Sequence, residues 1–254
     1  MKEDKVGEIN INTFGSKMII AKYRKYNDID VYFPEYDWTY YHTRYEHFKN
    51  GRIKCPYESR YYDKGYIGDG KYALSMNGMD TKVARIWSHM LERCYSNNLH
   101  KKYPTYKDCE VCDEWLNFQN FAEWCEKNYY EIEGERMDLD KDILSKNNKI
   151  YSPDTCIFVP SKINSVFAKK NWKTRGDLPT GVSICKNKKQ KYHSQCRIGS
   201  CTKHLGYYDT PEEAFMAYKT FKENYIKQIA DRYKEYIPEK LYNALYEYEI
   251  EYED

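Results

Sequence analysis

Short runs of alternating apolar and polar residues fill the first sixty positions of the chain. They have the two-residue period of a half-buried strand, and turn-forming pairs such as Asn27-Asp28 and Asn50-Gly51 bound them. The runs are Met18–Tyr23, Ile29–Phe33 and Trp38–Tyr41. This pattern predicts a small all-β module over residues 1–60, and the glycine-rich stretch Gly65–Gly70 predicts a linker over 61–80.

A helical period replaces the alternation in the middle of the chain. Two helices are predicted, Lys82–Tyr95 with Asp80 as its N-cap and Asp113–Asn128. The apolar positions on one face are Ile86, Met90, Leu91 and Cys94 in the first helix, and Trp115, Phe118, Phe121, Ala122 and Cys125 in the second. Over residues 136–168 the pattern predicts a strand, a polar loop, a second strand and a helix that begins at Ser161, which is a β-β-α order.

Three short strands followed by a long helix are predicted at 179–236. In the second strand the alternation places Lys191, His193, Gln195 and Arg197 on one face and Tyr192, Ser194, Cys196 and Ile198 on the other. Thr210 is placed to cap the long helix, with Pro211 in its first turn. Pro238 is expected to end it, and an acidic helix is expected over 237–254.

The predicted fold class is therefore α+β, with several domains. A small N-terminal β module precedes a central ββα unit with its leading helices, and a C-terminal three-stranded sheet with a long helix follows. The expected domains are 1–60, the linker 61–80, 81–170, 178–236 and the acidic helix 237–254.

Charge is distributed unevenly, although the 41 basic and 39 acidic residues nearly cancel over the whole chain. Between Lys162 and Lys203 there are eleven Lys or Arg residues and a single acid, Asp177. A local excess of this size is typical of a phosphate-binding surface, because each neutralised phosphate releases counterions. Aromatic, Gln and His residues are interleaved with these charges at strand spacing, which favours a nucleic-acid surface over a solvated loop.

The remaining composition bears on compartment and cysteine chemistry. No apolar run is long enough to span a bilayer and the N-terminus lacks the apolar core of a signal peptide, so an intracellular protein with no membrane partner is expected. The nine cysteines are then expected as reduced thiols or metal ligands. Cys94, Cys109, Cys112 and Cys156 would supply four thiolates for a structural zinc site, and buried thiols are the alternative.

The segments Thr180–Cys185, Lys191–Ile198 and Lys203–Tyr218 resemble the Apetala-two/ethylene-response-factor (AP2/ERF) DNA-binding domain, which also occurs in phage and mobile-element endonucleases. The most specific positions are Leu205-Gly206, Asp209-Thr210 and Glu212-Glu213-Ala214. The resemblance implies a three-stranded sheet in the major groove, supported from behind by the helix. The residues expected to contact double-stranded DNA are Lys186, Lys188, Lys189, Lys191, His193, Gln195, Arg197 and Lys203.

The segments Leu139–Asn148 and Tyr151–Asn164 resemble the HNH (His-Me finger) nucleases of phage homing endonucleases. Upstream, Arg93-Cys-Tyr95 and Val111-Cys-Asp-Glu-Trp115 match the same group of phage proteins. The resemblance implies a metal-dependent DNA endonuclease of a phage or mobile element.

The resemblance assigns roles to individual residues of this chain. Asp140 takes the position of the first metal ligand and Asn164 that of the second, while Asn148, or its neighbour Asn147, takes that of the loop asparagine that orients the catalytic group. Lys141 stands where the general-base histidine of the family would be. A lysine at its ordinary pKa is protonated at neutral pH and does not activate water.

Three interpretations of this departure stay open. A metal held by Asp140 and Asn164 activates its own water, with Lys141 as an electrostatic clamp on the phosphate; or Asp142 acts as the base; or the site is inactive and the fold binds DNA only. Oxygen ligands favour Mg²⁺, or Mn²⁺, over Zn²⁺. The expected function is thus a sequence-directed, HNH-type DNA endonuclease. The alternatives are an inactive DNA-binding regulator and a phage counter-defence inhibitor that binds a host protein through the acidic, tyrosine-rich C-terminus.

Overall fold

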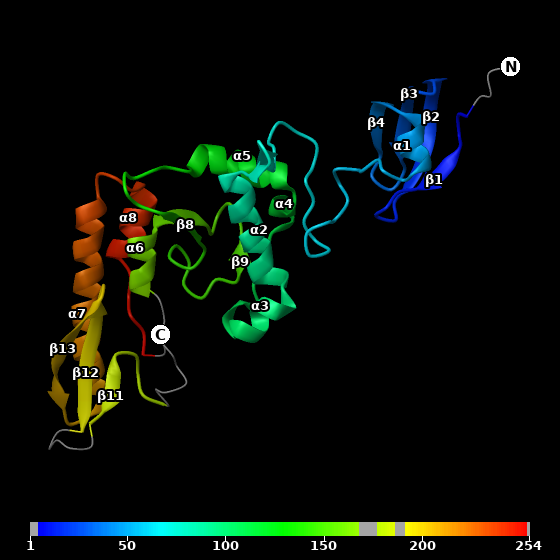
Figure 1. Ribbon diagram of the computed structural model, residues 1–254. Helices are drawn as coiled ribbons and strands as arrows, with labels where there is room; N and C mark the ends of the chain where they lie inside the picture. The colour runs from blue at the N-terminus through cyan, green and yellow to red at the C-terminus, as the bar shows by residue number, and fades with distance from the viewer. Residues whose placement is uncertain (1–4, 168–176, 186–190, 253–254) are drawn as a thin grey trace. The chain divides into compact units, whose positions relative to one another are not determined.

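The computed structural model describes residues 5–167, 177–185 and 191–252 (Figure 1). The chain is mixed α and β with several small sheets, which confirms the predicted α+β class. It divides into two compact units, residues 1–127 with 150–152, and residues 128–149 with 153–254. In the part of the chain that the structure describes, no helix combines the length and the apolar character needed to cross a membrane.

The N-terminal module is an antiparallel sheet in the order β1-β2-β3-β4. Its strands are β1 (Ile9–Ile11), β2 (Lys17–Lys25), β3 (Asp28–Phe33) and β4 (Trp38–Thr43). The three alternating runs are strands as predicted, but the expectation of an all-β module is wrong, because the helix α1 (Tyr45–Lys49) follows β4. Tyr45 and Phe48, three residues apart, lie on one side of this helix and are buried in the core of the module.

The helix α2 (Lys82–Tyr95) has the predicted bounds, but its predicted N-cap is wrong. The hydroxyl of Thr81 accepts the Ala84 N–H at 3.1 Å and thus caps the first turn. Asp80 instead belongs to a short hairpin of β5 (Ser75–Met76) and β6 (Met79–Asp80). The helix α3 (Asn97–Lys102) and a 3₁₀ turn, Pro104–Tyr106, follow α2.

The single helix predicted at 113–128 is two helices, α4 (Asp113–Leu116) and α5 (Phe118–Asn128). Asn117 between them is extended, because a distant segment pairs with the backbone there: the Tyr66 N–H donates to the Leu116 carbonyl and the Phe118 N–H donates to the Tyr66 carbonyl, both at 2.9 Å. The five positions of the predicted stripe are nevertheless buried. The short strand β7 (Glu110–Val111) pairs in parallel with β9 (Ile150–Tyr151).

The second unit contains the predicted β-β-α order and the predicted three strands with a long helix. The first group is β8 (Met137–Asp140), antiparallel to β10 (Ile157–Pro160), followed by α6 (Ser161–Asn164) and the 3₁₀ turn Ser165–Phe167. The second group is β11 (Val182–Ile184), β12 (Tyr192–Ile198), β13 (Cys201–Tyr208) and α7 (Pro211–Tyr233), which Thr210 caps as predicted.

The end of the chain differs from the prediction. The helix α7 ends at Tyr233, before Pro238 is reached, and the final helix α8 is confined to Glu239–Tyr246. Residues 247–252 are not helical, because this stretch packs back on α7. Ile250 is buried, and its carbonyl accepts the ammonium of Lys219 at 2.8 Å.

The two groups of the second unit share one hydrophobic core. Ile157 and Val159 of β10 and Ile163 of α6 belong to the same buried cluster as Ile226 of α7 and Leu241 of α8. The buried ammonium of Lys222, on α7, also donates to the Val166 carbonyl beyond α6 at 2.7 Å. The ββα group and the sheet with its helix are therefore joined by a continuous core, while the domain boundaries proposed from the sequence stay a prediction.

Gly181, directly before β11, allows the sheet to lie close to α7. Its φ is +76°, and a Cβ there would lie 2.1 Å from the ring of Tyr218 on α7. Gly199, in the turn between β12 and β13, has a φ of +56° and open space around it. We expect Gly199→Ala to lower the free energy of unfolding by about 1 kcal/mol, the cost of a left-handed alanine. Gly181→Ala should cost about 1–3 kcal/mol more through overpacking.

Urea denaturation of the two variants measures this difference. Equal stabilities of Gly181→Ala and Gly199→Ala would contradict the close packing of the sheet on α7.

Candidate functional site

The two faces of β12 differ sharply in burial. Ser194 and Cys196 are buried on the face covered by α7, whereas Lys191, Gln195 and Arg197 are exposed on the other face. The alternation predicted for this strand is therefore present, and the charged side chains lie on the face that α7 leaves open. In Figure 1 the three strands stand beside the long helix α7.

His193, the fourth residue of this face, is half-buried in a cluster of rings. Its Nε2 lies 2.5 Å from Nδ1 of His204 on β13, and its ring stacks on Tyr207 with the ring centroids 5.1 Å apart. Burial, and then the charge of His204, hold the pKa of His193 below its ordinary value. The neutral imidazole is thus favoured in the folded protein.

The other predicted DNA contacts are placed differently. Lys203 pairs with Cys196 between β12 and β13. Because paired residues share a face, Lys203 belongs to the face that α7 covers and not to the open face, although the residue is exposed. The Nε of Arg197 donates to the Gly199 carbonyl at 2.7 Å, which orients the guanidinium at the β12–β13 turn. Lys186, Lys188 and Lys189 lie outside the described residues.

The second candidate site is the face of β8 that carries two carboxylates. Met137 and Leu139 are buried, while Asp138 and Asp140 alternate with them and are half-buried. Oδ1 of Asp140 accepts the backbone N–H groups of Asp142 and Ile143, each at 2.8 Å, and so fixes the turn that leaves the strand. Burial raises the pKa of Asp140, the largest effect on this carboxyl, although these hydrogen bonds act in the opposite direction.

Lys141 closes the loop that follows β8. Its side chain is buried, and its ammonium donates to Oδ1 of Asp142 at 2.7 Å and to the Asn148 carbonyl at 2.6 Å. In return, the side-chain amide of Asn148 donates to the Lys141 carbonyl at 3.0 Å. The two residues bridge the loop in both directions, with the lysine ammonium engaged inside it. Asn147, the alternative loop residue, has a φ of +61°, a conformation that asparagine tolerates well.

Asn164 lies beside a carboxylate that the sequence argument missed. Its amide nitrogen is 3.5 Å from Oδ2 of Asp138, and that oxygen also accepts the Ser161 hydroxyl at 2.7 Å. Arg136 forms an ion pair with the other oxygen of Asp138 at 3.2 Å. Asp138 could have been predicted from the alternation of the strand, because it lies two positions before Asp140 and therefore shares its face.

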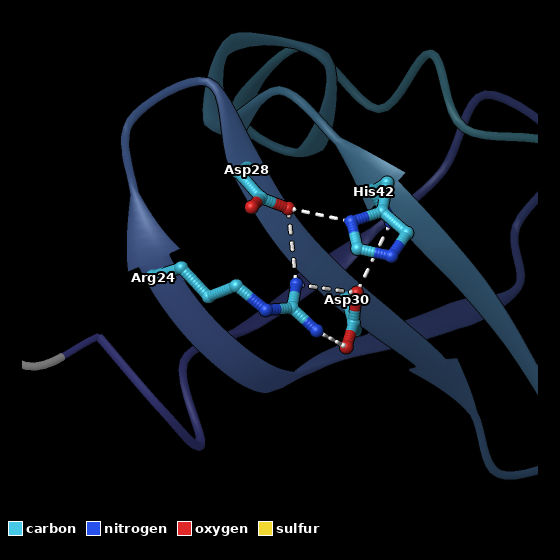
Figure 2. A network of polar contacts seen from close by, with 4 residues as sticks. All are labelled: Arg24, Asp28, Asp30 and His42. Carbon is cyan, nitrogen blue, oxygen red and sulfur yellow. Dashed lines mark hydrogen bonds and ion pairs between the residues drawn. The ribbon is translucent and has the colours of Figure 1, made fainter.

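A third cluster of carboxylates lies in the N-terminal module (Figure 2). Asp28, Asp30 and His42 are the one group of three His, Cys, Asp or Glu residues in the described ranges whose ligand atoms lie within 4.8 Å of one another. The guanidinium of Arg24 already occupies this cluster, at 3.0 Å from Asp28 and 2.6 Å from Asp30. Its charge would repel a metal ion.

Hydrogen bonds explain the electrostatics of this cluster. The hydrogen bond with His42, at 2.9 Å, is the main cause of the lowered pKa of Asp28. The hydrogen bond with Arg24 is the main cause of the lowered pKa of Asp30. His42 is held at a φ of +55°, and its backbone N–H donates to Asp30 at 3.1 Å. The four residues form an ion-pair network that ties β2, β3 and β4 together rather than a metal site.

The cysteines proposed for zinc are distributed over both compact units. Cys94 and Cys109 are buried and Cys112 is half-buried in the first unit, whereas Cys156 is buried in the second. Burial raises the pKa of Cys112, which disfavours its thiolate in the protein alone. The zinc site stays a prediction.

Comparisons with known proteins give no match to this chain: no protein-family model fits it, and no curated protein and no solved structure is significantly similar.

The lowered pKa of His193 makes the stability of the sheet depend on pH. The folded protein binds a proton at His193 less readily than the unfolded chain does. The free energy of unfolding should therefore fall as the pH is lowered from about 7.5 to about 5.5. His193→Gln should reduce this loss, because the unfolded chain no longer gains that proton, whereas His89→Gln, on the exposed side of α2, should not. Urea denaturation at the two pH values is the measurement, and an unchanged pH dependence in His193→Gln would contradict the prediction.

Proposed function

We propose that this protein binds duplex DNA through the open face of the β11–β12–β13 sheet. The observation that carries the proposal is the division of β12: Ser194 and Cys196 are buried against α7, while Lys191, Gln195 and Arg197 are exposed on the opposite face. A sheet covered by a helix on one side and cationic on the other has the form of strand-based DNA readers, which place their strands in a groove.

The exposed side chains have the chemistry for this task. A guanidinium such as that of Arg197 forms two hydrogen bonds to guanine, and an amide such as that of Gln195 pairs in the same way with adenine. Lys191 suits a phosphate contact, which positions the duplex without reading its sequence. Tyr207 and the two histidines add planar surfaces next to these groups.

We further infer that the ββα group of the same unit hydrolyses DNA phosphodiesters with Mg²⁺ or Mn²⁺. Asp138 and Asp140 share a face of β8 and Asn164 lies beside Asp138, and all three side chains have oxygen atoms that suit such an ion. The exposed guanidinium of Arg136, which is ion-paired with Asp138, would have to move away when the ion binds. Burial raises the pKa of Asp140 and so favours its neutral form, and a bound cation would act in the opposite direction and favour the carboxylate. The ion, when bound, would lower the pKa of a water molecule and neutralise charge on the phosphate.

The hydrogen bonds of the loop bear on the missing histidine. The ammonium of Lys141 is engaged by Asp142 and by the Asn148 carbonyl, an arrangement that suits a residue that holds the loop and contributes positive charge. The side chain of Asp142 is about half exposed to solvent, and it contacts Lys141, the residue that stands in the position of the histidine. We therefore place Asp140 and Asn164 as metal ligands, Asn148 as the residue that orients the loop, and Asp142 or the metal-bound water as the proton acceptor.

The same observation supports one alternative, a DNA-binding regulator that does not cleave. A lysine whose ammonium is bonded inside its own loop leaves the position of the general base without a proton acceptor. DNA binding is common to both functions. A cleavage assay distinguishes them.

DNA binding through the sheet predicts a specific dependence on salt. Replacing Lys191 and Arg197 together by alanine should weaken binding to duplex DNA. The slope of log K against log salt should fall by about 0.9 if Lys191 alone neutralises a phosphate, and by about 1.8 if Arg197 neutralises one as well. The control carries the same loss of charge at the carboxyl end of α7, through Arg232→Ala and Lys234→Ala. Fluorescence anisotropy of a labelled duplex at several salt concentrations measures both. Equal slopes for the two double variants would contradict the proposed interface.

Cleavage predicts a separate requirement for the β8 carboxylate. In Mg²⁺ or Mn²⁺ the protein should nick or linearise supercoiled plasmid, and Asp140→Ala should slow this at least about a hundredfold while DNA binding is retained. Asp154→Ala, an exposed acid before β10, should cleave at the normal rate. Binding without cleavage by the unaltered protein would support the regulator instead.

A further inference from the structure

An open recess of about 430 Å³ lies on the first compact unit. It is formed by the β3–β4 turn, by β4 and by the glycine-rich segment that follows the module. The lining residues are Asp37, Trp38, Thr39, Tyr40, Tyr41 and Asp69. Three of these six are aromatic, two are carboxylates and none is cationic, so the recess is both aromatic and acidic.

The aromatic side chains of the recess are one half-buried tryptophan, held by its neighbours, and two exposed tyrosines. Trp38 is half-buried; its ring packs against the buried Phe33 and contacts Tyr40 edge-on, each with the centroids 5.8 Å apart. Tyr40 and Tyr41 are 41% and 65% exposed, so a ligand in the recess can contact their rings. Aromatic faces held in this way attract cations through their π-electrons.

The two carboxylates are positioned by contacts inside the unit. Asp37 accepts the Tyr32 hydroxyl at 3.0 Å through Oδ1, and Asp69 accepts the Trp38 indole N–H at 3.3 Å through Oδ2. Each of these hydrogen bonds uses one of the two oxygens of its carboxylate. Both residues are exposed, so a ligand that arrives from solvent can reach their carboxylates.

The segment that carries Asp69 is itself held firmly. Gly68 and Gly70 lie so close to Asn117 and Gln119 that a Cβ would approach their side-chain oxygens to 2.1 and 2.4 Å. Gln119 also accepts the Tyr72 N–H at 2.9 Å. Asp69, between the two glycines, is therefore placed at the recess before any ligand arrives, which reduces the entropy lost on binding.

We propose that this recess binds the cationic side chain of a protein partner, an arginine or lysine within an extended basic segment. The two carboxylates would receive the cation and the rings of Trp38 and Tyr40 would flank it. Because β4 lies at an edge of its sheet, an extended segment can run beside it. Nucleic acid is disfavoured here, since the carboxylates repel phosphate. The site adds a protein contact to the proposed function and does not depend on DNA binding.

The test uses the full chain and two synthetic peptides of equal shape. The first, acetyl-Gly-Arg-Gly-Arg-Gly-amide, carries two guanidinium groups, and the second has citrulline, which is neutral, in place of each arginine. The indole N–H signal of Trp38, assigned with Trp38→Phe, is followed by NMR during titration. The arginine peptide should shift this signal saturably, and the citrulline peptide should not.

A pair of variants with equal charge loss locates the binding. Asp69→Asn keeps an acceptor for the Trp38 indole and should weaken the arginine peptide about tenfold, the effect of losing one charge-assisted hydrogen bond. Glu46→Gln, exposed on α1 of the same module, should leave the affinity unchanged. The variant with alanine at Lys191 and Arg197 should bind the peptide normally, so failure of the DNA proposal would not disturb this result.

Three results would overturn the proposal. Equal binding of the arginine and citrulline peptides, or unchanged affinity in Asp69→Asn, would show that the recess does not recognise a cation. A saturable Trp38 shift caused by a short DNA duplex, with no response to the arginine peptide, would assign the recess to nucleic acid instead.

Discussion

The packing of α7 against one face of the β11–β12–β13 sheet determines how the second unit presents its charges. Ser194 and Cys196 are removed from solvent by this contact, and the period of two then requires Lys191, Gln195 and Arg197 to face outward. Gly181 permits the close approach, because any side chain there would overlap the ring of Tyr218. The cationic face is thus a consequence of core packing, and a shift of one residue in β12 would bury the charges instead.

The same helix connects this face to the ββα group. Ile226 of α7 shares a core with Ile157, Val159 and Ile163, and Lys222 bonds to the carbonyl of Val166. A duplex bound on the sheet would therefore be bound by the same compact unit that carries Asp138, Asp140 and Asn164. This arrangement suits an enzyme that locates a site and cuts near it, and it equally suits a regulator in which the second group only adds contacts.

Much of this could be predicted from local sequence, where a short-range pattern decides the structure. The bounds of α2, the alternation in β12 and the cap at Thr210 depend on residues within one or two turns of each other. The break at Asn117 could not be predicted, because it depends on Tyr66, which is far away in sequence and whose backbone pairs with Leu116 and Phe118 on either side of Asn117. Nor could the pairing of Asn164 with Asp138, or of Asp69 with Trp38, since each joins elements that meet only in the fold.

The most direct measurement of the central claim is site-specific photo-crosslinking to duplex DNA. p-Benzoylphenylalanine is placed at Gln195, on the open face of the sheet, and separately at Met216, which is 54% exposed on α7. If DNA binds the open face of the sheet, irradiation should crosslink the protein to DNA from position 195 and not from position 216. Crosslinking from 216 alone, or from neither position under conditions where DNA is bound, would contradict it.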